Sequence, residues 1–268
     1  MERQMKPGKK DSAQSKRDHF MKSEKKEPIR LNKYLSDAGV CSRRQADRYV
    51  EEGRIHIDDI PAVMGQKVMP GQKVSLDGKE ISICKKRIFL VVNKPKGIVC
   101  TTERREKDNI VDFIGYPERI YPVGRLDKDS EGLLFMTNDG ELMDEILRAR
   151  NYHEKEYEVR VNKPVTMDFL KRMREGVPIL DTVTRPCHVT KTGPYTFRII
   201  LTQGLNRQIR RMCEALDYRV RDLRRIRIMN IRLLDLPVGK YRELTIEEET
   251  ELLRLAKRSS GKKPDGKE

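Results

Sequence analysis

The sequence predicts an α+β protein in which a small N-terminal domain precedes a larger domain built on a mixed, mostly antiparallel sheet. Apolar residues recur at helical spacing in two short segments near the N-terminus. Many short apolar strands follow, separated by Pro and Gly turns, and the helices among them show no regular β–α–β alternation. With 268 residues the chain is long enough for two small domains or one large one.

The charge balance indicates a polyanionic partner. Lys and Arg outnumber Asp and Glu by 57 to 42, which leaves a formal net charge of +15. Nucleic acid is the simplest such partner, and a merely basic surface is the alternative. Five cysteines without a C-x-x-C pair disfavour a disulfide framework, and the scattered histidines disfavour zinc. No apolar run is long enough to cross a bilayer, so we expect a soluble, cytoplasmic protein with no membrane partner.

The chain divides by composition into four parts. Residues 1–28 and 258–268 are charged and poor in apolar residues, so we expect a disordered basic arm and a disordered basic tail. Between them, turn signals separate a first domain at 29–77 from a second at 85–257. The tails could add phosphate contacts to RNA, and a solvated tail with no specific role is equally compatible with this composition.

Two helices open the first domain. Leu31 and Leu35 lie at helical spacing, and Gly39 ends their helix. Ser42 and Gln45 form a capping box for the second helix, SRRQADRYVEEG. The two arginines in its first turn oppose the helix dipole, which indicates an anionic partner nearby, although exposed arginines tolerate this position at little cost. Short strands RIHI and KVSL complete the module.

The run RLNKYLSDAGVCSRRQADRYVEEGRIHID resembles an S4 RNA-binding domain. The resemblance implies that five positions face RNA: Arg30, Lys33, Ser42, Arg43 and Arg44. One departure is Asp58-Asp59, where many S4 domains have Asn-Gly. We expect this pair to change the type of hairpin turn without altering the binding face.

Strands and helices alternate irregularly in the second domain. The expected strands are RIFLVVNK, IYPV, GLLFMT, KEYEVRV, HVTKTG and TFRIILTQG. Helices are expected at GELMDEILRAR, VTMDFLKRMREG, NRQIRRMCEALD and EEETELLRLAK.

The stretch DKDSEG, which begins at Asp127, shares its carboxylate spacing with an EF-hand calcium loop. Position twelve is Asn138 instead of Glu, and Pro117 and Pro122 disfavour an entering helix, so calcium binding is disfavoured. A two-carboxylate hydrolase site is a further alternative. If the strand continues, however, Asp127 and Asp129 project to opposite faces, and hydrogen bonding within the loop is the more natural role for the second acid.

The segment NRQIRRMCEALD predicts an amphipathic helix with Asn206 as its N-cap. Its apolar stripe follows the i, i+3, i+4, i+7 pattern of a core-facing helix: Ile209, Met212, Cys213 and Leu216. Arg207 and Arg211 point away from that stripe, whereas Arg210 lies at its margin. A partly buried arginine there is suited to a bidentate grip on a carboxylate.

Four blocks resemble the motifs of the RsuA-type RNA pseudouridine synthases: VVNKPKGIVCTT, PVGRLDKDSEGLLFMTNDGEL, HEKEYEV and GLNRQIRRMCEALDYRV. The resemblance covers about residues 29–257, and its wording is closest to the RluF branch, which modifies large-subunit ribosomal RNA. It implies isomerisation of a specific uridine in RNA to pseudouridine, with base flipping and without cofactor or metal. The expected substrate is 23S ribosomal RNA, with small-subunit ribosomal RNA and then transfer RNA as further candidates, and the expected enzyme is a monomer.

The resemblance also assigns the site. Asp127 is the carboxylate that acts beside the ribose, Tyr157 packs on the target base, and Arg210 pairs with Asp127. The implied RNA-binding positions of this domain are Lys94, Arg125, Arg207 and Arg225. For Tyr157 alone, core packing is the alternative, and for Arg125 it is a structural salt bridge.

Two functions from other classes stay open at this point. The S4-like module and the basic charge would suffice for a catalytically silent RNA-binding or ribosome-assembly factor. A metal-dependent nuclease would use Asp127, Asp129 and Glu131 and lose activity with a chelator. The joint presence of Asp127, Tyr157 and Arg210 favours the synthase, because a carboxylate in an RNA-facing groove repels phosphate and serves no purpose in a pure binder.

Overall fold

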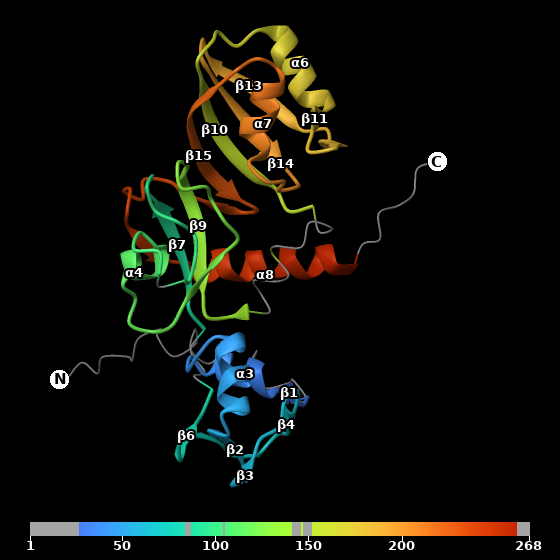
Figure 1. Cartoon of the computed structure of the whole chain (residues 1–268). Helices are drawn as coiled ribbons and strands as arrows, with labels where there is room; N and C mark the ends of the chain where they lie inside the picture. The colour runs from blue at the N-terminus through green and yellow to red at the C-terminus, as the bar shows by residue number, and fades with distance from the viewer. Residues whose placement is uncertain (1–26, 84–86, 104, 141–145, 147–151, 262–268) are drawn as a thin grey trace, which may run out of the picture. The chain divides into compact units, whose positions relative to one another are not determined.

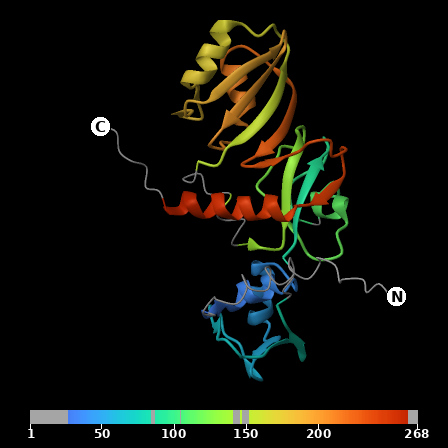
Figure 2. The same cartoon turned by 180° about the vertical axis from the view of Figure 1, so that it is seen from behind.

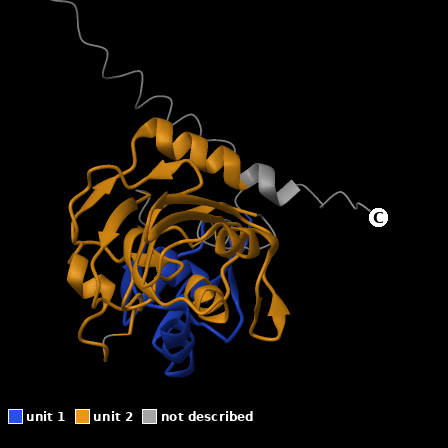
Figure 3. Cartoon of the chain, turned by 90° about the horizontal axis from the view of Figure 1, so that it is seen from above, with its two compact units in different colours: residues 1–83 blue, residues 84–268 orange. Residues whose placement is uncertain are grey.

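The computed structural model of this chain describes residues 27–83, 87–103, 105–140, 146 and 152–261 (Figure 1). It divides into two compact units, residues 1–83 and residues 84–268, which Figure 3 shows in different colours. Most of the basic arm, most of the basic tail and the helix expected at GELMDEILRAR lie outside the described residues.

The first unit contains the two predicted helices. Helix α2 spans Leu31–Asp37 and α3 spans Arg43–Glu51. They pack through a core that includes Leu35 and Ala46, and the Asn32 amide donates to the Asp47 carboxylate at 2.9 Å. A four-stranded antiparallel sheet has the order β3-β2-β5-β6, with β2 at Ile55–Ile57, β3 at Ile60–Pro61, β5 at Val74–Leu76 and β6 at Lys79–Ile81. Strand β1 (Ile29–Arg30) pairs with β4 (Lys67–Val68).

The hairpin between β2 and β3 corrects an expectation. Asp58 and Asp59 both adopt the left-handed conformation, with φ of 49° and 65°. A two-residue loop with both φ angles positive is a type I′ turn, the type that Asn-Gly also forms, so the expected change of turn type is wrong. Aspartate tolerates this conformation, and here the Asp58 carboxylate is also held by hydrogen bonds from the Lys73 amide at 2.9 Å and the Gln72 side chain at 2.7 Å.

The second unit is built on one nine-stranded sheet with the order β13-β14-β10-β15-β9-β7-β17. All strand pairs are antiparallel except β9 with β15, which confirms the mixed, mostly antiparallel sheet. The strands on this path are β13 (His188–Gly193), β14 (Thr196–Leu201), β10 (Lys155–Val161), β15 (Val220–Ile228), β9 (Glu131–Thr137), β7 (Phe89–Lys94) and β17 (Tyr241–Glu243). Off this path, β8 (Tyr121–Val123) pairs with β9 and β16 (Ile231–Arg232) pairs with β15, and β11 (Pro178–Ile179) and β12 (Thr182–Val183) form a separate hairpin.

Helices cover different parts of this sheet (Figures 1 and 2). Helix α6 (Met167–Glu175) and α7 (Gln208–Ala215) pack on the β10–β13–β14 part through a shared apolar core. Helix α8 (Ile246–Gly261) packs on the β7–β9 part, and the short α4 (Ile110–Ile114) joins a third cluster over those strands. In the part of the chain that the structure describes, no helix has both the length and the apolar character needed to cross a bilayer.

Candidate active site

The loop that carries Asp127, residues 124–130, leads from β8 into β9 and is held by hydrogen bonds before and after Asp127. The Ser130 amide donates to the Asp127 carbonyl at 3.0 Å, which makes residues 127–130 a tight turn. The Leu126 amide, directly before Asp127, donates to the buried Cys100 thiol sulfur at 3.3 Å. Asp127 itself keeps 32% of its side chain exposed, so a rigid loop presents a carboxylate to solvent.

Lys94 supports this loop from the protein interior. Its side chain has no exposed surface, and its ammonium donates to the carbonyl oxygens of Pro95 and Ser130, both at 2.8 Å. Burial lowers the pKa of Lys94, and the nearby Cys100 and Asp129 oppose that shift. The expectation that Lys94 contacts RNA is therefore wrong for this structure, because a fully enclosed ammonium cannot reach a phosphate.

Helix α7 begins differently from the prediction. Its N-cap is Arg207, in the left-handed conformation (φ 50°, ψ 34°), and the expected Asn206 cap is wrong. Asn206 instead accepts hydrogen bonds from the Arg211 guanidinium on its backbone carbonyl at 3.1 Å and its side-chain oxygen at 3.3 Å. The Gln208 side chain accepts from the Leu205 amide at 3.1 Å, so this turn before the helix is satisfied from within.

The apolar stripe of α7 orients its arginines as expected. All four residues of the stripe are buried: Ile209, Met212, Cys213 and Leu216. Each such side chain contributes roughly 1.5–3 kcal/mol on burial, so the helix is held firmly in one rotation about its axis. Arg210 then lies at the buried margin with 7% exposure and faces the Asp127 loop, whereas Arg207 stays exposed.

Arg210 contacts the loop at several points. Its Nη2 lies 3.1 Å from the Ser130 hydroxyl, 3.1 Å from the Asp129 carbonyl and 3.2 Å from the Asp129 carboxylate. Its Nε lies 3.9 Å from Asp127 Oδ2. The structure thus brings Arg210 and Asp127 together, but the expected bidentate grip is wrong. The guanidinium fastens the turn and reaches Asp127 through one long ion pair.

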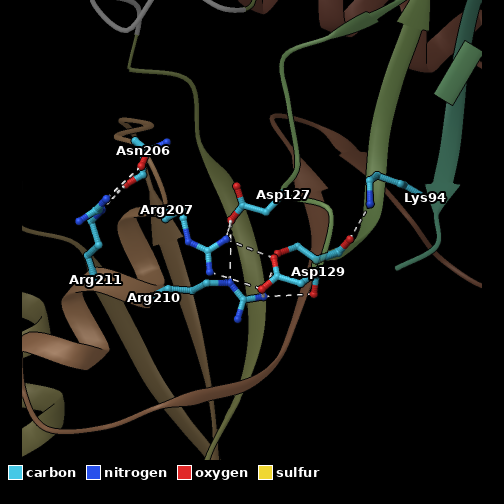
Figure 4. A network of polar contacts seen from close by, with 8 residues as sticks. Lys94, Asp127, Asp129, Asn206, Arg207, Arg210 and Arg211 are labelled. Carbon is cyan, nitrogen blue, oxygen red and sulfur yellow. Dashed lines mark hydrogen bonds and ion pairs between the residues drawn. The ribbon is translucent and has the colours of Figure 1, made fainter. Parts of the chain in front are cut away.

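Arg207 contacts both loop acids from the solvent side (Figure 4). Its Nη1 lies 3.5 Å from Asp127 and 3.4 Å from Asp129. The two acids thus meet one guanidinium. The alternation argument, which placed them on opposite faces, required an extended strand, and the chain here forms a turn. Burial acts to lower the pKa of Arg207. The hydrogen bond and charge of Asp129, together with the charge of Asp127, outweigh it and raise that pKa above its ordinary value.

Tyr157 lies on β10 opposite Arg225 of β15. It is half-buried between two apolar clusters, and the Arg225 guanidinium carbon lies 5.9 Å from the ring centroid. Arg225 is only 3% exposed and donates through Nε to the Leu133 carbonyl at 2.7 Å. Its expected direct contact with RNA is not compatible with this burial, so in this structure Arg225 supports the tyrosine that lies next to it.

The remaining predicted cations are exposed, except for Lys33, which is partly buried. Arg125 precedes the turn at residues 127–130 and, among the described residues, makes no ion pair. In the first unit, the Ser42 hydroxyl accepts from the Gln45 amide at 3.1 Å, which begins α3 with Arg43 and Arg44 exposed in its first turn. Arg30 is exposed at the start of α2, and the Lys33 ammonium lies 2.6 Å from the Asp37 carboxylate.

Sequence reasoning missed three features of the site. Asp129 was assigned only to loop hydrogen bonding, yet it pairs with both Arg207 and Arg210. Its D-x-D spacing with Asp127 was the available signal. Nothing in the sequence pointed to Cys100 as an acceptor for the loop or to Ser130 as a partner of Arg210. Across the described residues, no group of three or more His, Cys, Asp or Glu side chains is arranged to hold a metal ion.

A mixed sheet that presents the Asp127 and Asp129 carboxylates to two arginines, in a chain that also carries a small two-helix module, is the arrangement that the sequence predicted for an RNA-modifying enzyme. This chain belongs to the RNA pseudouridylate synthase family, whose model matches residues 88–215, and the S4 domain model matches residues 29–77. It is 51% identical over 242 residues to the dual-specificity RNA pseudouridine synthase RluF of Escherichia coli strain K12, covering 89% of this chain and 83% of that protein.

Other relatives agree with this assignment. The chain is 30% identical to the ribosomal large subunit pseudouridine synthase B of Bacillus subtilis strain 168, with 85% of this chain and 96% of that protein covered. A crystal structure of a pseudouridylate synthase matches with a TM-score of 0.61 and 25% identity, over 85% of this chain and 99% of that one. The predicted family, its RluF-like wording and the enzyme class are confirmed.

Proposed function

We propose that this enzyme isomerises one specific uridine of large-subunit ribosomal RNA to pseudouridine, as a monomer in the cytoplasm and without a cofactor. The observation that carries the proposal is the placement of Asp127, part exposed on a fixed loop and flanked by Arg207 and Arg210. Arg210, Arg207 and Tyr157 all come from the same chain as Asp127, so these groups of the site need no second subunit. The similarity to an enzyme named RluF and to a ribosomal large subunit synthase supports the substrate.

The chemistry requires an ionised carboxylate beside the ribose. Two guanidinium groups lie within 4 Å of the Asp127 carboxylate. Asp127 then either attacks C1′ or removes the 2′ proton, and the N1–C1′ bond breaks with its electrons going to the base. The detached uracil turns and C5 bonds to C1′, while the bond from Asp127 to C1′ breaks or the 2′ proton returns to its carbon. The C5 proton is then lost while N1 gains one. No group enters or leaves, so substrate and product have the same atoms.

Tyr157 is placed to hold the detached base. Its ring offers a flat apolar face, and the neighbouring Arg225 and the two flanking apolar clusters fix its orientation. A uridine stacked in a helix cannot bring its C1′ to a loop carboxylate, so the proposal includes extrusion of the target nucleotide. Unstacking costs a few kcal/mol, which the contacts to exposed arginines must offset.

The direct test replaces Asp127. Asp127→Asn keeps the size of the side chain but removes the charge, and it should abolish pseudouridine formation on ribosomal RNA transcribed in vitro while RNA binding survives. Asp168→Asn, at an exposed acid of helix α6 in the same unit, serves as the control. Turnover by Asp127→Asn at the parent rate would remove this carboxylate from the mechanism.

The S4 domain is tested through its charge. Replacing Arg43 and Arg44 by Gln in the full chain should weaken RNA binding and lower the slope of log affinity against log salt by about 2, because each phosphate contact releases counterions. The rate at saturating RNA should stay close to the parent value. An unchanged salt slope would show that these two residues do not contact phosphate.

The identity of the RNA is the finer part of the proposal. The Escherichia coli relative is named a dual-specificity enzyme, so large-subunit ribosomal RNA and transfer RNA are both tested. Pseudouridine positions are mapped in cellular RNA with and without the enzyme. Loss of a site in 23S ribosomal RNA supports the proposal, and losses confined to small-subunit or transfer RNA would reassign the substrate.

A further inference from the structure

Two arginines approach the loop acids, and they are held in very different ways. Arg210 retains 8% of its side-chain surface and has three contacts to the turn at 3.1–3.2 Å. Arg207 retains 41%, and its contacts to the acids are 3.4–3.5 Å long. Well-formed ion-pair hydrogen bonds measure about 2.7–2.9 Å. Arg210 is therefore part of the fixed frame, and Arg207 is held loosely at the solvent side.

The backbone at Arg207 has a direct bearing on this difference. Arg207 adopts φ 50° and ψ 34° as the N-cap of α7, a conformation that is unfavourable for a residue with a Cβ. The chain between Asn206 and Gln208 is fixed by its own hydrogen bonds. As a result, the Arg207 side chain extends from the start of α7 toward Asp127 and Asp129.

We propose that Arg207 is exchanged between two anions: in the free enzyme it pairs with Asp127 and Asp129, and on binding it moves to a phosphate of the RNA next to the target nucleotide. This inference rests on the proposed function and deepens it. Arg207 contacts Asp127 from the solvent side, where the ribose has to approach, so its departure widens access to the carboxylate. A phosphate can accept two parallel hydrogen bonds from the same guanidinium, which makes a stronger ion pair than the long contacts to either carboxylate.

Asp129 gives the exchange its specificity. Asp129 keeps 51% of its side chain exposed and also pairs with Arg210 at 3.2 Å, so its charge stays partly compensated when Arg207 leaves. The Asp129–Arg207 ion pair must break before Arg207 can bind RNA. Only an RNA that places a phosphate within reach of Arg207 gains more binding free energy than the broken ion pair costs. Asp129 is thus a specificity-determining residue that acts through Arg207 and need not touch the reacting uridine.

The test is a double-mutant cycle on binding. The probe is an RNA hairpin without uridine, which cannot react, so Asp127 stays intact. Arg207→Gln should weaken binding roughly tenfold and lower the salt slope by about 1. Asp129→Asn should tighten binding about three- to fivefold at low salt, since the competing ion pair is gone. In the Arg207→Gln protein, the same Asp129→Asn change should tighten binding less than about 1.5-fold.

Glu131→Gln is the matched control, because it removes one negative charge four residues from Asp127 without an ion pair to Arg207 among the described residues. It should leave affinity within about 1.5-fold of the parent. An equal gain from Asp129→Asn with and without Arg207 would show simple charge removal and overturn the exchange. An unchanged salt slope in Arg207→Gln would overturn it as well.

Turnover separates this inference from the proposed function. On transcribed ribosomal RNA, Asp129→Asn should lower discrimination between target and non-target RNA about threefold or more, with kcat less affected than KM. If no variant and no parent protein forms pseudouridine, the proposed function fails while the hairpin cycle still reports on the exchange. If the parent is active and the cycle is additive, only the exchange fails.

Discussion

Gly132 lies against the backbone of Arg225 where the parallel strands β9 and β15 meet. A β-carbon on Gly132 would stand 2.7 Å from the Arg225 backbone nitrogen and closer still to its carbonyl oxygen. Gly132 also has φ of 107°, which residues with a side chain rarely adopt. This glycine therefore allows β15, with Arg225, to approach β9, the strand that follows the Asp127 loop.

Gly132→Ala should destabilise the protein strongly. Backbone strain and collision with β15 together should cost on the order of 3 kcal/mol or more of the free energy of unfolding, measured by denaturant titration. Gly97→Ala is the control, since Gly97 has φ of 88° but open space around it, and it should cost only about 1–2 kcal/mol. Equal losses for the two variants would show that the close approach to β15 has no energetic weight.

Arg210→Lys should reduce catalysis far more than RNA binding. One ammonium cannot contact Ser130, Asp129 and Asp127 together, and misplacing a reacting group by about 1 Å costs on the order of 100-fold in rate. Ser130→Ala removes one of these contacts and should cost about three- to tenfold. Single-turnover rates at saturating RNA check both. A lysine variant as active as the parent would exclude the guanidinium geometry from the mechanism.

Lys94→Met should lower the rate without changing the salt dependence of RNA binding. The buried ammonium holds the Ser130 carbonyl and reaches no phosphate, so its loss perturbs the loop and not the RNA contacts. Arg125→Gln, at an exposed position, should show the reverse pattern and lower the salt slope by about 1. A lower salt slope for Lys94→Met would restore its assignment as a phosphate ligand.

Lys155 should make stability depend on pH in the alkaline range. Burial first, and then the charge of Arg225, lower the pKa of Lys155 from 10.5 to about 8. The folded state therefore binds fewer protons than the unfolded state between these values, so stability rises as pH increases from about 8 to about 10.5. Lys155→Met should flatten this rise in denaturant titrations. Parallel stability curves for parent and variant between pH 8 and 10.5 would contradict the assignment.

The family, the fold class and the main strands could be predicted because long motifs and apolar runs carry them. Strand β15 could not, although it lies at the centre of the sheet. Four of its nine residues are arginine, so its sequence lacks the apolar pattern of a buried strand. Two of its arginines bond to partners distant in sequence: Arg225 donates to the Leu133 carbonyl and Arg227 to the Glu156 carboxylate.

The site shows the same division between local and distant causes. The rotation of α7 follows from its apolar stripe, so the burial of Arg210 was predictable. The left-handed Arg207 was not, because a residue with a side chain at that conformation is stable only when surrounding contacts impose it. The enclosure of Lys94 likewise depends on the Ser130 carbonyl, which lies 36 residues away.

The position of β15 in the sheet has a consequence for biosynthesis. Asp127 is translated long before Arg210 and Arg225. Yet Arg210 contacts the Asp127 loop, and Arg225 lies on the strand that pairs with β9, which follows that loop. A nascent chain that ends before β15 lacks the centre of its sheet, and closing so long a stretch of polypeptide is entropically slow. Catalytic competence should therefore arise late on the ribosome, after the C-terminal third of the polypeptide has emerged.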